Sequence, residues 1–308
     1  MTENEFLQSL AQRFPARNPV LHGIGDDGAV LQAEPHGRVV VVTDMLLDGT
    51  HFRLSEITPA LAGRKALAVN LSDLAAMLAK PTAAFISLAI PRATTDSTAF
   101  LQSLYHGLQE LADEFHCIIA GGDTNSWDGP FAINVALTGS PLSTSIPLRS
   151  GARPGDLLFV TGPLGGSLAS GRHLTFRPRL DIARWLADSV SVSALMDISD
   201  GLATDLPRMM QASGTSARLT AADIPIHSDV PPDLPPALRL QAALSDGEDF
   251  ELLLAVPPAA ATALQAAPEG LAFQQIGSVE TGQGITLLMP DGQVDYFGDD
   301  WLELVSLA

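Results

Sequence analysis

Short apolar segments alternate with longer segments of helical periodicity along most of the chain. In the first half, the apolar runs at residues 38–44 (RVVVVTD) and 82–91 (TAAFISLAIP) each precede a long stretch, at 59–80 and 96–115 respectively. The spacing of apolar side chains in the long stretches predicts helices, and the short runs between turn residues predict buried strands. Strands that alternate with helices in this way predict an α/β or α+β fold.

A change in composition divides the chain into two halves. Residues 142–156, LSTSIPLRSGARPGD, are rich in Ser, Pro, Gly and Arg, the residue types that mark loops and linkers. A second series of strand-like and helix-like segments follows, and 308 residues are too many for one small core. We therefore expect an N-terminal α/β domain over residues 1–141 and a C-terminal α/β domain over residues 142–308.

The charge and composition exclude several classes of partner. The formal net charge is −18, and Lys65 and Lys80 are the only lysines; nucleic-acid surfaces need many basic side chains, so we expect no nucleic-acid partner. No apolar run reaches the roughly 18–20 residues that span a bilayer, and the acidic first residues do not resemble a signal peptide. The single cysteine, Cys117, excludes an intramolecular disulfide. These features predict a soluble cytoplasmic protein without a membrane partner.

Many of the apolar segments end near carboxylate residues, often beside glycine. These carboxylates are Asp26, Asp27, Asp44, Asp73, Asp123, Asp197, Asp200, Glu248 and Asp249. Asp before Gly is ordinary turn and helix-capping chemistry, so each one alone favours a structural role. As a group they also suit Mg²⁺, which prefers carboxylate oxygens and is completed by phosphate and water. Asp73 favours this second interpretation, because it lies inside a predicted helix, where Asp is a poor helix former.

Other nucleotide-binding and hydrolase motifs are absent from the sequence. No G-x-x-x-x-G-K-[ST] loop and no G-x-S-x-G elbow occurs. The glycine-rich segment GPLGGS at residues 162–167 follows a predicted strand. It is either a tight turn or the start of a helix whose N-terminus meets an anion.

Several motifs in order along the chain carry a resemblance to a known family. They include GIGDDGAVL, KALAVNLSDLAAM, GGDT, RSGARPGD, DISDGL and GEDFELL, spread over about residues 22–300. With these motifs the chain resembles the thiamine-monophosphate kinase family. This family lies in the superfamily of aminoimidazole ribonucleotide synthetase and selenophosphate synthetase.

The resemblance implies a fold, a reaction and an assembly. It implies the two-domain fold of aminoimidazole ribonucleotide synthetase and a homodimer in which the sheets of the N-terminal domains pair. It implies transfer of the γ-phosphoryl group of ATP to thiamine monophosphate, giving thiamine diphosphate. ATP would be the co-substrate and several Mg²⁺ ions would bridge its phosphates to aspartates, with K⁺ as an additional candidate ion.

The resemblance also assigns roles to individual residues. The implied metal ligands are Asp27, Thr43, Asp44, Asp73, Asp123, Asp197 and Asp200. Of these, the residues expected to act most directly in catalysis are Asp44, Asp73, Asp123 and Asp200. The implied ATP-binding residues are Phe115, Gly121, Gly122, Asp123, Thr124, Arg149 and Ser199. The implied substrate-binding residues are His51, Glu248 and Trp301. Asp26 is expected to stabilise the glycine turn rather than bind metal.

The chain departs from the family pattern at a few positions. Val42 stands where a serine is frequent, and Phe115 offers a ring without a hydroxyl group. The segment after Gly171 is shorter than in relatives, which usually insert about twenty residues there. At the C-terminus the aromatic side chain that stacks on the substrate would be Trp301, with Tyr296 and Phe297 as alternatives.

Two other functions are compatible with the motifs. One is another ATP-dependent enzyme of the same superfamily, although the reactive N-terminal Cys and Lys of selenophosphate synthetase are absent. The other is a non-catalytic, nucleotide-binding regulator on the same fold. A regulator would be expected to have lost some of the metal-binding positions, and all seven are filled here.

Overall fold

The computed structural model describes residues 9–10, 12–22, 30–32, 38–94, 96–292 and 294–297. The chain divides into two compact units. Unit 1 contains the residues up to Leu74 together with Ala79–Pro141, and unit 2 contains Ala75–Leu78 together with the residues from Leu142 onward. Before the first strand, residues 9–10 and 12–13 are helical.

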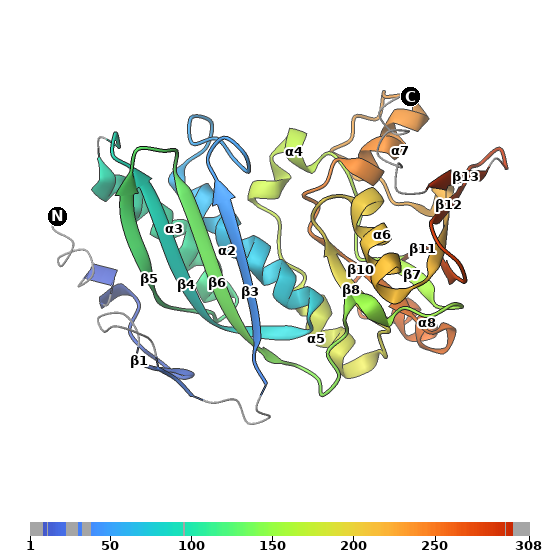
Figure 1. Cartoon of the computed structure of the whole chain (residues 1–308), viewed down its shortest axis with the longest axis horizontal. Coiled ribbons are helices and arrows are strands. Elements are labelled where there is room, and N and C mark those ends of the chain that lie inside the picture. Colours follow the sequence, from blue (N-terminus) through green and yellow to red (C-terminus); the bar gives the residue numbers. More distant parts are fainter. Residues whose placement is uncertain are drawn as a thin grey trace. The chain divides into compact units, whose positions relative to one another are not determined.

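Unit 1 is built on a four-stranded sheet in the order β3-β6-β4-β5. Its strands are β3 (Val40–Leu47), β4 (Ala79–Pro91), β5 (Ile118–Trp127) and β6 (Ala132–Pro141). β6 is antiparallel to both β3 and β4, while β4 and β5 are parallel. A short hairpin of β1 (Val20–His22) and β2 (Val30–Leu31) precedes the sheet. The helices α2 (Pro59–Ala76) and α3 (Ser97–Glu114) lie against one face of the sheet (Figure 1).

The two helices approach each other closely at glycines. A Cβ atom on Gly63 of α2 would lie 2.3 Å from the carbonyl oxygen of Leu104, and one on Gly107 of α3 would lie 1.9 Å from that of Ala60. Only glycine permits this backbone approach. α3 begins at Ser97 because the Asp96 side chain accepts a hydrogen bond from the Ala99 amide at 2.9 Å.

Two boundaries differ from the sequence expectations. α2 ends at Ala76 rather than near residue 80, because Leu78 has a left-handed φ of +45° and β4 begins at Ala79. Pro81, which follows the stretch expected to be helical, lies within β4 at a register shift. The glycines of AGGDT were expected to end a strand, but β5 continues through them to Trp127. A Cβ on Gly122 would lie 1.8 Å from the carbonyl oxygen of Ile86 on β4, so glycine is required for this pairing.

Unit 2 is built on a seven-stranded sheet in the order β13-β12-β9-β11-β7-β10-β8. Its strands are β7 (Leu157–Val160), β8 (Ala194–Ile198), β9 (Ser216–Thr220), β10 (Glu251–Val256), β11 (Gln274–Glu280), β12 (Ile285–Leu288) and β13 (Val294–Phe297). Neighbouring strands are antiparallel except for β12 and β9, which are parallel. The two mixed sheets with their helices confirm the expected α/β (α+β) class.

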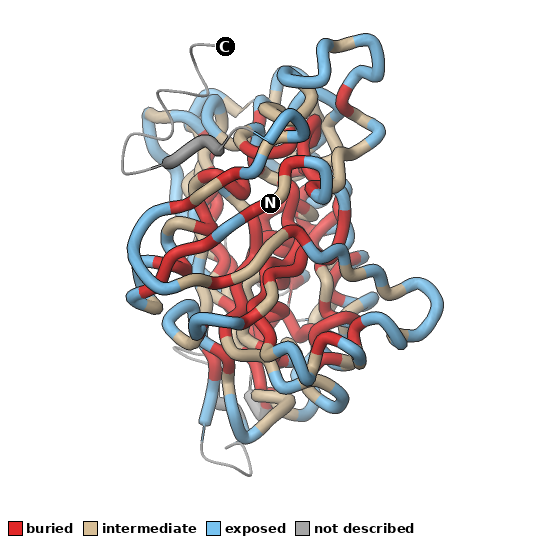
Figure 2. The backbone as a smooth tube through the Cα atoms, turned by 90° about the vertical axis from the view of Figure 1, so that its right-hand side faces the viewer, coloured by how far each residue is buried: buried red, intermediate tan, exposed pale blue. Residues whose placement is uncertain are grey.

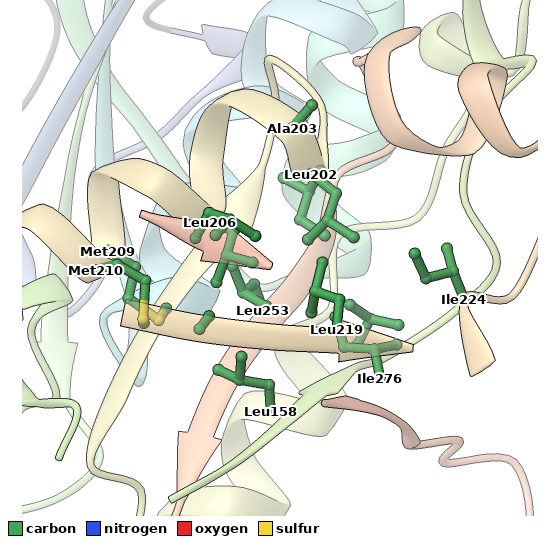
Figure 3. Packing of buried hydrophobic residues seen from close by; sticks show 14 of the residues in the cluster. Leu158, Leu202, Ala203, Leu206, Met209, Met210, Leu219, Ile224, Leu253 and Ile276 are labelled. Carbon is green, nitrogen blue, oxygen red and sulfur yellow. The ribbon is translucent and has the colours of Figure 1, made fainter. Parts of the chain in front are cut away.

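The helices of unit 2 are short, and one of them carries much of the core. They are α4 (Ser167–Ser170), α5 (Leu180–Ser189), α6 (Leu202–Ser213), α7 (Pro236–Ser245) and α8 (Pro258–Gln265), with 3₁₀ turns η1 (Arg149–Gly151), η2 (Arg172–Leu174) and η3 (Ala221–Asp223). Figure 3 shows Leu202, Leu206 and Met209 of α6 over Leu219 and Leu253 of the sheet. Burial of these side chains fixes α6 on the sheet.

Buried and exposed stretches of residues alternate along the chain (Figure 2), and most residues of α2 are buried. β8 and β10 are buried along their whole length. Within the described ranges, no helix is both long enough and apolar enough to cross a bilayer.

Candidate active site

Asp44 and Asp73 form a carboxyl pair in unit 1. Asp44 lies on β3 and Asp73 on α2; both are half-buried, and their side chains share a hydrogen bond. Burial raises the pKa of Asp44, and the hydrogen bond with Asp73 and the charge of His51 partly offset that rise. Two carboxylates are both acceptors, so their hydrogen bond requires a shared proton. A divalent cation between them would take the place of that proton.

His51 is held in the turn that follows β3. The Leu47 amide donates to Nδ1 of His51 at 3.0 Å, and the fully buried Lys65 donates from Nζ to the His51 carbonyl oxygen at 2.8 Å. Because Nδ1 accepts, the neutral imidazole carries its proton on Nε2. His51 therefore presents a hydrogen-bond donor close to the Asp44 carboxyl group.

Thr43 and Asp44 direct their side chains to opposite faces of β3. The burial pattern alternates along the strand, with Thr43 exposed and Asp44 half-buried. Asn134 of β6 donates from Nδ2 to Thr43 Oγ1 at 3.0 Å and to the Asp44 carbonyl oxygen at 3.1 Å. The two side chains therefore cannot share one ion, and a metal-binding role for Thr43 would have to involve its backbone.

Asp123 lies apart from the Asp44–Asp73 pair within unit 1. β6 and β4 separate β5 from β3, so the two positions are three strand spacings, or about 14 Å, apart. The exposed Asp123 carboxylate accepts hydrogen bonds from the Thr124 amide at 2.9 Å and from Asn125 Nδ2 at 2.8 Å. Among the residues that the structure describes, no three His, Cys, Asp or Glu side chains form a group able to hold a metal.

The expected ATP-binding residues of unit 1 occupy two places. Gly121, Gly122 and Thr124 lie beside Asp123 in the middle of β5, where Gly121 faces the ring of Phe85. Phe115 is half-buried at the C-terminal end of α3, before β5 begins. The two glycines therefore lie next to Asp123, whereas Phe115 lies before the first residue of β5.

In unit 2, Asp197, Ser199 and Asp200 lie at the junction of β8 and α6. Asp197 is buried at 4% exposure, while the Asp200 carboxylate is paired with Arg208 of α6. The amides of Ser199 and Asp200 donate to Asp205 Oδ2 at 3.0 and 2.9 Å. The structure brings these three residues together, and a metal at Asp200 would compete with Arg208.

Asp205 is a structural residue of this junction that the sequence motifs did not single out. Its carboxyl group is buried, which raises its pKa, and the Asp200 amide and the Arg208 guanidinium partly offset the rise. The sequence signal for Asp205 was its place in the first turn of a helix, shortly after a glycine.

Arg149 lies at the other end of α6. The side chain of Ser213, the last residue of α6, donates to the Arg149 carbonyl oxygen at 2.8 Å, whereas Ser199 precedes the first turn of that helix. α6 has 12 residues and rises about 18 Å. A nucleotide that touches both Arg149 and Ser199 would have to extend along α6.

Glu248 lies in a short segment before β10 that contacts two other loops. Its backbone has a left-handed φ of +57°, and its amide donates to the Ser199 carbonyl oxygen at 2.6 Å. Its carboxylate lies 3.5 Å from Nδ1 of His173 and its side chain is 21% exposed. The structure thus brings the expected substrate residue Glu248 next to the Ser199–Asp200 turn.

The glycine-rich segment GPLGGS is a turn whose amides already bind carboxylates of the chain. Gly165 donates to both oxygens of Asp249 at 2.9 and 3.1 Å, and Gly166 donates to Asp246 Oδ2 at 2.8 Å. The helix that follows, α4, has four residues. Of the two interpretations, the structure therefore favours the tight turn.

Two predicted site residues, Asp27 and Trp301, lie outside the described residues, and so does Asp26, which was expected to stabilise a turn. Tyr296 and Phe297 belong to β13, of which only the backbone is described.

Family models match most of the chain. The model of the AIR synthase related protein N-terminal domain matches residues 25–140, and that of the AIR synthase related protein C-terminal domain matches residues 153–289. Both matches confirm the two-domain fold implied by the sequence motifs.

Curated relatives and solved structures narrow the family. The thiamine-monophosphate kinase of Rhodopirellula baltica is 40% identical over 293 residues, which are 92% of this chain and 91% of that protein. The crystal structure of the thiamine-monophosphate kinase of Stenotrophomonas maltophilia has a TM-score of 0.80 at 29% identity, covering 94% of this chain and 95% of the other. The structure of AaThiL complexed with AMPPCP and TMP has a TM-score of 0.72 at 28% identity, covering 94% of each chain. The chain therefore belongs to the thiamine-monophosphate kinase family.

Proposed function

We propose that this chain transfers the γ-phosphoryl group of ATP to thiamine monophosphate and so forms thiamine diphosphate. The name of the 40% identical relative supports this reaction, and AaThiL is complexed with AMPPCP and TMP. Within the chain, the observation that carries the proposal is the Asp44–Asp73 pair beside His51. Phosphoryl transfer depends on positioning and charge neutralisation rather than on covalent chemistry, and a carboxyl pair of this kind suits both needs.

The donor set fits Mg²⁺. Asp44 and Asp73 lie within hydrogen-bonding reach of each other, and a cation bound there would offset their like charges. Bound there, Mg²⁺ would neutralise phosphate charge and polarise the transferred group. Asp27, Thr43, Asp123, Asp197 and Asp200 remain proposed as further ligands, because their positions match the family motifs. Phosphate oxygens and water would complete the coordination, and K⁺ remains a candidate for an additional ion.

The acceptor needs little activation. A phosphate monoester is largely deprotonated near pH 7, so its oxygen can attack the γ-phosphorus without a general base. His51 carries its proton on Nε2 in the neutral form and can therefore donate a hydrogen bond to a phosphate oxygen. We propose that His51 orients the acceptor phosphate and that no phospho-enzyme forms.

Residues of unit 2 would bind the remaining parts of the two substrates. Arg149 is exposed and can pair with a phosphate, and Ser199 lies beside Asp200. Glu248 presents a half-buried carboxylate, which suits the positively charged thiazolium ring of the acceptor. Phe115, Gly121, Gly122 and Thr124 remain proposed nucleotide contacts in unit 1, and Trp301 a proposed substrate contact.

We also propose that the protein is a cytoplasmic homodimer. The face of the unit 1 sheet opposite α2 and α3 carries exposed apolar side chains; Val41 is 65% exposed, Met45 60% and Trp127 43%. An apolar sheet face of this kind favours pairing with a second copy. Residues 1–141 would then provide the dimer interface and part of the Mg²⁺ and ATP site, and residues 142–308 would complete the site.

The test of the reaction uses the purified chain with ATP, Mg²⁺ and thiamine monophosphate. We expect thiamine diphosphate and ADP to form in equal amounts, separated by chromatography and measured over time. Asp96→Asn is the matched control for later Asp→Asn variants, because Asn caps a helix as well as Asp. Bound ATP without thiamine diphosphate would refute the proposed activity and favour a nucleotide-binding regulator.

A further inference from the structure

The segment from Asp246 to Phe250 is bonded to two separate loops of unit 2. On one side, the amides of Glu248 and Phe250 donate to the carbonyl oxygens of Ser199 at 2.6 Å and Ile198 at 2.8 Å. On the other side, Ser167 Oγ donates to the Glu248 carbonyl oxygen at 2.6 Å. Glu248 and Phe250 both have left-handed backbones, with φ of +57° and +53°. Non-glycine residues persist in this conformation only where their surroundings hold them.

Asp249 is the most strongly bound member of this segment. Its side chain is fully buried and accepts hydrogen bonds from the Gly165 amide at 2.9 and 3.1 Å and from Arg172 Nη2 at 3.0 Å. The neighbouring Asp246 accepts one from the Gly166 amide at 2.8 Å. A buried carboxylate with several donors holds both partners in a fixed geometry.

Arg172 completes the contact from the short connection after α4. Its Nη2 also donates to the Gly165 carbonyl oxygen at 2.9 Å, and its Nε donates to Asp229 Oδ2 at 2.9 Å. The guanidinium thus binds the turn and the 246–250 segment at once, and its side chain is 19% exposed. A lysine could not make this set of contacts, because its donors radiate from one atom.

The contacts fix Glu248 at both ends of its backbone. The peptide before Glu248 is bound to Ser199, and the peptide after it carries the Asp249 carboxylate into the glycine turn. Gly247 permits the approach, since a Cβ there would lie 3.0 Å from the Ser199 carbonyl oxygen at a φ of +70°. The backbone position of Glu248 is therefore held by Asp249 and Arg172, and its carboxylate lies 3.5 Å from Nδ1 of His173.

We propose that Asp249 and Arg172 are positioning residues that aim the Glu248 carboxylate at the cationic part of the acceptor substrate. This inference rests on the proposed kinase function. It assigns the specificity for the acceptor to a buried ion pair that does not itself touch substrate. Loss of the pair should weaken binding of thiamine monophosphate more than it slows the chemical step.

The experiment compares Asp249→Asn and Arg172→Lys with the wild type in steady-state kinetics and in calorimetric titration with thiamine monophosphate. We expect Asp249→Asn to raise KM and Kd for thiamine monophosphate at least about tenfold, with kcat and the KM for ATP within about threefold. Arg172→Lys should show a smaller rise of the same kind. The Arg172 variant removes the other side of the same contact and gives the test if Asp249→Asn fails to fold.

The matched control is Asp229→Asn. It removes another carboxylate partner of Arg172 without touching Gly165 or the 246–250 segment, so KM for thiamine monophosphate should stay within about threefold of the wild type. An unchanged KM in the folded Asp249 or Arg172 variants would overturn the inference, as would an equal loss in kcat and in the KM for both substrates. Wild-type protein that forms no thiamine diphosphate would refute the kinase function instead, so the two failures are distinguishable.

Discussion

The Asp44–Asp73 pair lies where the proposed reaction needs positive charge, and the two carboxyl groups can be hydrogen-bonded only while one of them holds a proton. Burial favours the neutral form of Asp44. Binding of a divalent cation must therefore release this proton, so metal affinity should fall in acid. The proton affinity of the pair in the folded chain thus sets how strongly the proposed metal binding depends on pH.

We expect Asp73→Asn to remain folded and to lose activity. The amide can donate a hydrogen bond to the Asp44 carboxylate without a shared proton, so the free energy of unfolding should change little. One negative charge of the metal site is lost, and kcat should fall by at least about 10³-fold. Steady-state kinetics at saturating Mg²⁺ and urea unfolding measure the two effects. Near wild-type kcat, with Asp96→Asn unchanged beside it, would contradict the metal role of Asp73.

Asp249 should make stability depend on pH. Burial raises its pKa to about 6, although Arg172 and the Gly165 amide oppose the rise. The unfolded chain has the ordinary value of about 3.9, so between pH about 4 and 6 the folded state binds a proton that the unfolded state does not. The contribution of Asp249 to the free energy of unfolding is thus largest in acid and falls by up to about 3 kcal/mol as pH rises through this window.

Urea unfolding between pH about 4 and 7 tests this dependence. The difference between wild type and Asp249→Asn should change across the window. For the control Asp229→Asn, burial raises the pKa of Asp229, but Ser170 and Arg172 outweigh it and lower the pKa overall. The contribution of Asp229 should therefore be lost as pH falls, the opposite sign. A difference for Asp249→Asn that does not vary with pH would contradict the raised pKa.

The sequence motifs point to single residues but not to the contacts between distant residues. Asp44, Asp73 and His51 were proposed as site residues because they belong to short family motifs; Asp73 and His51 both influence the Asp44 carboxyl group, and the roles of all three stay predictions. Arg172 and Asp249 could not be paired in this way, because 77 residues separate them and their contact exists only after the sheet of unit 2 has formed.

At the scale of elements, the contact of α2 with α3 depends on glycine. We expect Gly107→Ala to destabilise the protein by about 2 kcal/mol: the new methyl group meets the Ala60 carbonyl oxygen and overpacking outweighs the helix propensity gained. Gln102→Ala on the exposed side of α3 is the control and should stay within about 0.5 kcal/mol. Urea unfolding measures both variants. Equal stability of Gly107→Ala and the wild type would show that the helices can separate without cost.

Elements were predictable where the period of apolar side chains was long and unbroken. α3 was predicted from the pattern over residues 96–115 and spans Ser97–Glu114. The end of α2 and the length of β5 were predicted wrongly, because Pro and Gly were taken as residues that end a helix or a strand. Pairing with β6 keeps Pro81 in a strand, and pairing with β4 carries β5 through Gly121 and Gly122.

At the scale of the whole molecule, the apolar face of the unit 1 sheet makes the proposed dimer testable. We expect wild-type protein to sediment as a dimer, and the double variant Val41→Lys with Met45→Lys to sediment as a monomer, because buried unpaired charge opposes association. The control is Leu238→Lys with Leu288→Lys, two exposed leucines of unit 2. A monomeric wild type, or a double variant that remains dimeric, would contradict the proposed interface.

The burial of Lys65 has a practical consequence for handling the protein. Of the two lysines, both within the described ranges, Lys65 is fully buried and Lys80 is exposed at the start of β4. An amine-reactive fluorophore or surface coupling should therefore modify one lysine side chain in the native protein and two after denaturation. The folded enzyme could be immobilised through a single, known side chain, and the second coupling would report unfolding.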